Sequence, residues 1–177
     1  MINVLFAGDI VGSRGCDFAE DTVRRLKGKE KIDIVIVNGE NSADGNGITK
    51  RSMEQIFSFA DVITTGNHCF RRKEFTEYYD IKENLLRPAN YPDGVAGHGV
   101  CVLDMGAYSF AVVNLMGTAF MEPLNNPFEC IDRLLEDIHT PNILVDFHAE
   151  ATSEKKAMGF YLAGKVSAVI GTHTHVQ

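Results

Sequence analysis

The chain has 177 residues, of which 45% are hydrophobic and 23% are charged, and its formal net charge is −7. This composition is that of a globular domain, and no apolar run approaches the length that a membrane-spanning helix needs. The acidic balance argues against an extended nucleic-acid-binding surface, but it allows a small phosphate-containing ligand held by bound cations.

Residues 1–7 lack a basic segment and read directly as a strand, so we expect no signal peptide and a cytoplasmic location. The four cysteines are widely spaced and form no Cys-X-X-Cys pair. We therefore expect reduced thiols rather than disulfides or a structural zinc site.

Apolar strands and amphipathic helices alternate in the first half of the chain. We expect strands at residues 2–7, 32–37 and 61–65, with helices that end near residue 26, span about 49–59 and span about 73–79. A glycine-rich turn at residues 8–15 joins the first strand to the first helix. Its glycines, at positions 8, 12 and 15, do not have the spacing of the dinucleotide-binding fingerprint, which disfavours that function.

A hairpin interrupts this alternation in the second half. Strands are expected at residues 99–103 and 108–114, followed by a helix that begins at Asn126-Pro127 and ends near Ile138. A buried strand at 142–146, a helix at about 153–162 and a strand at 167–170 complete the pattern. We predict a single α/β domain over residues 1–177.

Residue types that bind metals follow five of the expected strands. In order along the chain they are Asp9, Glu40, Asn41, Asn67, His68, His148, His173 and His175. Each alone has a structural explanation, as a turn former or a solvated histidine. However, ligand sites of α/β sheets lie outside the carboxyl ends of the strands, so five such segments meeting at one edge predict a metal site.

The donor types narrow the choice of metal. Carboxylate, amide and imidazole groups without thiolate suit Mn, Fe, Co or Zn and suit Mg or Ca poorly. The donors are too many for one tetrahedral ion, which indicates two divalent ions that share the carboxylate of Glu40. Such a site carries net positive charge and attracts a phosphodiester anion.

The motifs at the strand ends resemble those of a known superfamily. Gly8-Asp9, Gly39-Glu40-Asn41, Gly66-Asn67-His68, His148 and the run from Gly171 to His175 are similar to those of the calcineurin-like metallophosphoesterases. Three longer motifs, Asn38 to Asn41, Arg87 to Asn90 and Asp146 to Lys155, resemble the bacterial YmdB branch. Most of the superfamily has a histidine where this chain has Val11, and in the YmdB branch the residue at Asn41 fills that gap.

The resemblance implies a fold of two stacked mixed sheets flanked by helices, incomplete at its C-terminus, and a dinuclear site. One metal would be held by Asp9, Glu40, Asn41 and His175, and the other by Glu40, Asn67, His148 and His173. His68 would stand beside them to assist the leaving group while a metal-bridging hydroxide attacks phosphorus in line. The implied reaction is hydrolysis of cyclic nucleotides such as 2′,3′-cyclic AMP, with iron or manganese as the metal.

Members of this family usually continue for several dozen residues beyond the motif at His173. An open sheet edge and an uncovered apolar face would favour association, so we expect a homo-oligomer or reduced stability. Two other functions remain open: a metal-dependent regulator without turnover, and a dinuclear hydrolase of a non-phosphate bond. We expect structural roles for His98, His139 and Cys69. Arg87 and Asn90 could contact the substrate, but a structural role for them is at least as well supported.

Overall fold

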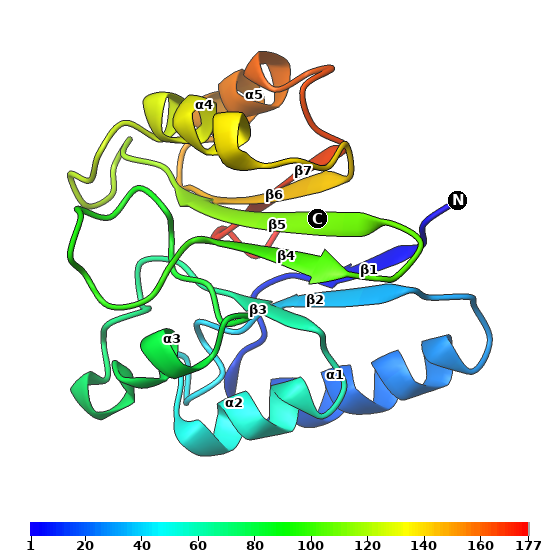
Figure 1. Ribbon diagram of the computed structural model, residues 1–177. Helices are drawn as coiled ribbons and strands as arrows, with labels where there is room; N and C mark the ends of the chain where they lie inside the picture. The colour runs from blue at the N-terminus through cyan, green and yellow to red at the C-terminus, as the bar shows by residue number, and fades with distance from the viewer. Residues whose placement is uncertain (177) are drawn as a thin grey trace.

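The computed structural model describes residues 1–176, which form two β-sheets stacked between two layers of helices (Figure 1). The first sheet has the order β1 (Val4–Ala7), β2 (Ile34–Asn38), β3 (Val62–Thr64), all parallel. The second has the order β4 (Val100–Asp104), β5 (Ser109–Met116), β6 (Ile143–His148), β7 (Ala168–Thr172), with only β4 antiparallel. The predicted fold class is confirmed.

Helices α1 (Gly12–Lys27), α2 (Lys50–Phe57) and α3 (Tyr78–Ile81) cover the outer face of the first sheet (Figure 1). Helix α1 begins within the glycine-rich turn, at Gly12, whose φ of +65° is a conformation that glycine adopts without strain. The expected helix at 73–79 is instead a 3-10 turn, Lys73–Phe75, followed by the short α3.

Helices α4 (Pro127–Asp137) and α5 (Thr152–Tyr161) cover the outer face of the second sheet (Figure 1). The predicted start of α4 is confirmed, because Asn126 caps the helix by accepting a hydrogen bond from the Phe128 amide at 2.9 Å, with proline at the first position. No helix in residues 1–176 is long and apolar enough to cross a membrane.

Three apolar layers hold this arrangement together. Two of them lie between a sheet and the helices that cover it, and the third lies between the two sheets. The central layer is built from Ile34, Ile36, Val62, Leu86, Phe110, Val112 and Leu144. Strand β2 is buried on both faces, which explains why its sequence is a continuous apolar run.

Strands β6 and β7 extend further than their apolar runs predict. His148 is the last residue of β6 rather than the start of a loop, and Gly171 and Thr172 belong to β7. In the parallel register His148 lies opposite Thr172. The sheet itself therefore fixes the position of His148, which is fully buried.

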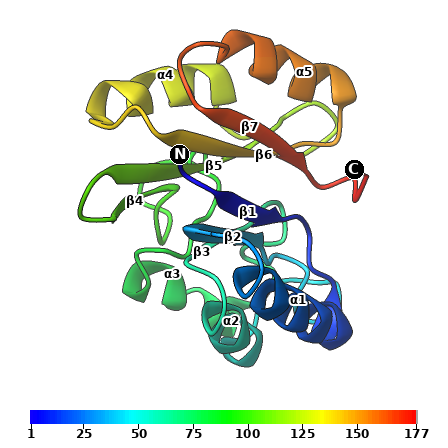
Figure 2. The ribbon, with the colours of Figure 1, turned by 90° about the vertical axis from the view of Figure 1, so that its right-hand side faces the viewer.

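One side of the molecule leaves both sheets open. Strands β1 and β7 are edge strands, and Figure 2 views the molecule from this side. A groove of about 780 Å³ lies between them, and its apolar lining includes Val4, Phe6, Phe110, Leu144 and Ile170.

Candidate metal centre

The carboxyl ends of five strands bring the eight predicted residues to one edge of the molecule. Asp9 lies just beyond β1, Glu40 and Asn41 beyond β2, and Asn67 and His68 beyond β3. His148 ends β6, while His173 and His175 follow β7. Because these ends meet at one edge of the two sheets, short segments without long loops position every side chain of the site.

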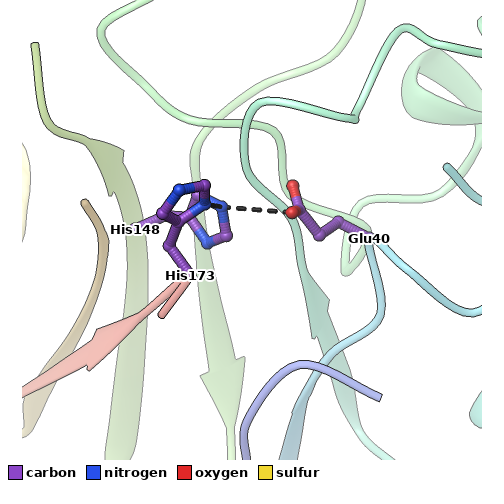
Figure 3. Close-up of side chains that lie close together, drawn as sticks. All are labelled: Glu40, His148 and His173. Carbon is purple, nitrogen blue, oxygen red and sulfur yellow. Dashed lines mark hydrogen bonds and ion pairs between the residues drawn. The ribbon is translucent and has the colours of Figure 1, made fainter. Parts of the chain in front are cut away.

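The tightest part of the site surrounds one ring nitrogen of His148. Its Nε2 atom lies 3.1 Å from Glu40 Oε1, 3.1 Å from Asn67 Oδ1 and 3.1 Å from His173 Nδ1. Figure 3 shows the Glu40 carboxylate directed at the His148 ring, with the His173 ring beside it. Glu40, His148 and His173 form a group whose ligand atoms all lie within 4.8 Å of one another.

A buried polar network fixes the other side of the His148 ring. Asp146 Oδ2 accepts hydrogen bonds from Asn38 Nδ2 at 3.1 Å and Thr64 Oγ1 at 2.5 Å. Thr172 Oγ1 donates to Asp146 Oδ1 at 2.7 Å and lies 2.9 Å from His148 Nδ1. A hydroxyl has one hydrogen, so Thr172 must accept from His148, and Nδ1 carries the proton.

This network is consistent with an ionised Asp146 near neutral pH. Burial raises the pKa of Asp146 to about 6, although the hydrogen bonds from Thr172 and Thr64 oppose that rise. Above that pH the carboxylate can only accept hydrogen bonds, which keeps the Thr172 hydroxyl directed toward it. The free lone pair of His148 is therefore on Nε2, facing the cluster.

This arrangement fits a bound cation. A lone pair of His148 faces the Glu40 carboxylate and the Asn67 carbonyl oxygen, and lone pairs repel one another unless a proton or metal lies between them. Burial lowers the pKa of His148, but its hydrogen bond and charge interaction with Glu40 more than offset this, so the pKa lies above its ordinary value. The attraction that favours a proton at this point also favours a metal ion.

A second part of the site lies around Asp9. Its Oδ1 atom is buried and has no hydrogen-bond partner among residues 1–176, whereas its Oδ2 atom accepts from the His173 amide at 3.0 Å. His175 Nε2 lies 3.6 Å from Oδ1. A buried carboxylate oxygen without a donor is costly unless a cation compensates it, so this oxygen also fits a metal.

Asn41 lies next to Glu40 rather than next to Asp9. Its Nδ2 group donates to Glu40 Oε1 at 3.3 Å, and its Oδ1 atom lies 2.7 Å from His68 Nδ1. Within the described part of the chain, no hydrogen bond or ion pair joins the Glu40–Asn41 pair to the Asp9–His175 pair. The structure thus brings Glu40, Asn67, His148 and His173 close together. The other expected ligand set is divided into two pairs, Glu40 with Asn41 and Asp9 with His175.

His68 lies at the side of the cluster. Its backbone amide donates to Glu40 Oε2 at 3.0 Å, and its side chain is 25% exposed. Because Asn41 Oδ1 is an acceptor, His68 Nδ1 carries a proton and Nε2 is left free of the ligand cluster.

The loop that carries the last two histidines has an unusual backbone. His173 and His175 have φ values of 91° and 54°, a region that side chains other than glycine rarely adopt. Lys155 stabilises the loop, because its Nζ donates to Thr174 Oγ1 at 2.9 Å. His173 Nε2 also lies 3.0 Å from Glu150 Oε2.

Four of these residues had no predicted role: Asp146, Thr172, Glu150 and Lys155. All four lie inside the sequence motifs, which could have indicated a role. Asp146 is in addition a charged residue at a buried strand position. By contrast, Arg87 and Asn90 are structural, because the guanidinium donates to the Pro88 and Ala96 carbonyls and Asn90 bonds the Met116 backbone.

The chain is similar to several known proteins. A family model described as YmdB-like protein matches residues 5–177. The chain is 46% identical to the 2′,3′-cyclic-nucleotide 2′-phosphodiesterase of Bacillus subtilis, covering 99% of the chain and 68% of that protein.

Two crystal structures are similar along nearly the whole chain. A hypothetical protein from Thermus thermophilus gives a TM-score of 0.92 with 42% identity, over 98% of this chain and 68% of that one. A novel phosphatase from Mycoplasma pneumoniae gives a TM-score of 0.92 with 33% identity, over 99% of this chain and 65% of that one. The chain thus spans about two thirds of the length of these relatives.

Proposed function

The chain belongs to the YmdB-like family, and on that basis we propose that it is a metal-dependent phosphodiesterase acting on cyclic nucleotides of the 2′,3′-cyclic AMP type. The observation that carries the proposal is the convergence of Glu40, Asn67 and His173 on His148 Nε2. The name of the Bacillus subtilis relative supports the substrate class.

The proposed ligands are divided between two ions. Glu40, Asn67, His148 and His173 would hold one, and Asp9, Glu40, Asn41 and His175 the other. Imidazole, carboxylate and amide donors without thiolate favour iron or manganese. When bound, two such ions neutralise the charge of a phosphodiester and lower the pKa of a water molecule.

The chain's own residues would orient the substrate and move the proton. Asn41 holds His68 by Nδ1, so the ring keeps a fixed direction and Nε2 remains available to protonate the leaving oxygen. The Thr172–Asp146 network holds His148 in the tautomer that binds metal through Nε2.

The test separates metal binding from proton transfer. Hydrolysis of 2′,3′-cyclic AMP with added Mn²⁺ is measured beside metal content. We expect His68→Ala to lower kcat by about 10²- to 10⁴-fold with metal content unchanged. His148→Ala and Asn67→Ala should lose metal, and a chelator should abolish turnover in the unsubstituted protein.

His98→Ala is the matched control, because this histidine bonds the Glu83 carbonyl at 2.7 Å and takes no part in the site. Equal metal loss in His68→Ala would show that the assigned roles are wrong. Full metal occupancy without turnover of any phosphodiester would instead favour the regulator or the hydrolase of another bond.

We also propose that the chain forms homo-oligomers through its open side. Edge strands β1 and β7 present unpaired backbone groups, and the groove between them is lined by apolar side chains. Both features favour association with another chain.

A further inference from the structure

The loop after β5 is anchored directly to the candidate metal centre. The Gly117 amide donates to the His148 carbonyl at 2.9 Å. The next two amides, of Thr118 and Ala119, donate to the Glu154 carboxylate at 2.9 Å and 3.2 Å. The start of this loop is therefore held in place by charge-assisted hydrogen bonds.

The following residues of the loop reach both sides of the site. Met121 Sδ lies 3.3 Å from the amide of Glu150, which follows His148 by two residues. Glu122 forms an ion pair at 3.9 Å with Arg71, which follows His68 by three residues. The loop thus lies between the segment that carries the central ligand and the segment that carries the proposed acid.

Phe120 lies between these anchors. Its side chain is 91% exposed and belongs to none of the apolar clusters. Its φ of 63° is one that an aromatic residue adopts only at a cost in backbone energy. Packing among residues 1–176 does not explain an exposed apolar ring on a strained but well-anchored backbone, and such outliers cluster at functional sites.

Phe120 lies only a short distance along the chain from a residue that contacts the centre. It follows Gly117 by three residues, and an extended chain spans at most about 3.6 Å per residue, so its Cα lies within roughly 11 Å of Gly117. Gly117 itself touches the His148 backbone. The ring is thus carried by a loop whose first residue is bonded to the backbone of the central ligand.

We propose that Phe120 is a stacking platform for the nucleobase of the substrate, an inference that rests on the proposed phosphodiesterase function. Every nucleobase has a π-face, so stacking on an aromatic ring adds affinity without selecting among bases by hydrogen bonds. The platform would favour nucleotides over phosphodiesters that lack a base, and would treat purine and pyrimidine substrates similarly.

The test compares two cyclic diesters that share a five-membered phosphate ring: 2′,3′-cyclic AMP, and glycerol 1,2-cyclic phosphate, which has no base. Phe120→Asn removes the ring but suits the left-handed backbone. We expect it to raise KM for the nucleotide by about tenfold, with kcat unchanged and hydrolysis of the glycerol diester unaffected. Phe120→Trp should keep the nucleotide KM of the unsubstituted protein or lower it.

Phe160→Asn is the matched control, since Phe160 is 83% exposed near the end of α5 and should affect neither substrate. An unchanged nucleotide KM in Phe120→Asn would overturn the platform and leave the phosphodiesterase standing. Equal losses on both diesters would also overturn it, because they would mean that Phe120 only shapes the loop. If the unsubstituted protein hydrolyses neither diester, the proposed function fails and the platform fails with it.

Discussion

At His148, one hydroxyl hydrogen decides which ring nitrogen can bind a metal. Thr172 gives its hydrogen to Asp146 and so receives one from Nδ1. Among residues 1–176, no charged group lies within hydrogen-bond distance of Nδ1, and Asp9 Oδ1 is 4.0 Å away. The Asp146 carboxylate thus acts on the imidazole through a neutral intermediary. Because all three groups are buried, water does not compete for these hydrogen bonds.

Thr172→Val tests this network with little change in shape. It leaves Asp146 Oδ1 and His148 Nδ1 without a partner, so we expect a loss of about 1–3 kcal/mol in the free energy of unfolding. Metal affinity should fall by about 10- to 100-fold. Denaturant unfolding of the metal-free protein and calorimetric metal titration measure the two effects.

Thr172→Ser keeps the hydroxyl and serves as the control. In ¹⁵N spectra of the metal-free protein at neutral pH, the Nδ1 of His148 should remain protonated in this variant and lose that preference in Thr172→Val. An Nδ1 signal that is the same in both variants would contradict the role given to Thr172.

At the scale of elements, the sequence predicts the buried parts of the strands well, but it does not predict how far β6 and β7 continue through polar residues. The run Ile34 to Val37 reads as a strand because both of its faces are buried. Strands β6 and β7 continue through polar residues, including His148 and Thr172, whose partners come from distant parts of the chain. Asn38 and Asp146, for example, are 108 residues apart, and no local pattern encodes that pairing.

Some features of the candidate site can also be predicted from the sequence, and others cannot. Ligand types at strand ends could be predicted, because parallel strands must bring their carboxyl ends together. The left-handed backbone at His173 and His175 and the placement of Asn41 against His68 could not, since both depend on tertiary contacts.

The end of β3 approaches β6 so closely that only glycine fits between them. A Cβ atom added at Gly66 would collide with the ring of His148. We therefore expect Gly66→Ala to displace the ring, to lower stability by about 1–3 kcal/mol, and to reduce metal content. Metal analysis and thermal unfolding would measure these changes.

Gly8→Ala is a matched control for this prediction. Gly8 also follows a strand, but a Cβ there would meet no atom within 4 Å. This variant should bind metal as the unsubstituted protein does. Normal metal content in Gly66→Ala would show that His148 can move without loss of the site.

At the scale of the whole molecule, the edge strands β1 and β7 lie on the same side and leave both sheets open there (Figure 2). Within residues 1–176, strand β7 pairs only with β6, and strand β1 pairs only with β2. The groove between them lies beside the loop that holds the last two histidines, since Ile170 lines it and Thr172 ends the same strand. Covering the open side would therefore also support the metal centre.

Ala168→Lys tests association through this side. Ala168 lies on β7 and lines the groove, and a lysine there would bury an unpaired charge in any interface. We expect it to weaken self-association by on the order of 100-fold, measured by analytical ultracentrifugation.

The control places the same charge on the opposite edge of the second sheet. Val102 on β4 is 54% exposed, and Val102→Lys should leave the assembly unchanged. A protein that stays monomeric at all accessible concentrations would contradict the proposed association.

The hydrogen bond from the His173 amide to Asp9 Oδ2 joins residues 164 positions apart. At typical rates of translation, roughly 10–30 s separate the synthesis of these two residues. During that interval Asp9 and Glu40 are carboxylates without their histidine partners. We therefore expect stable loading of the proposed centre with metal only after the ribosome has added His173 and His175.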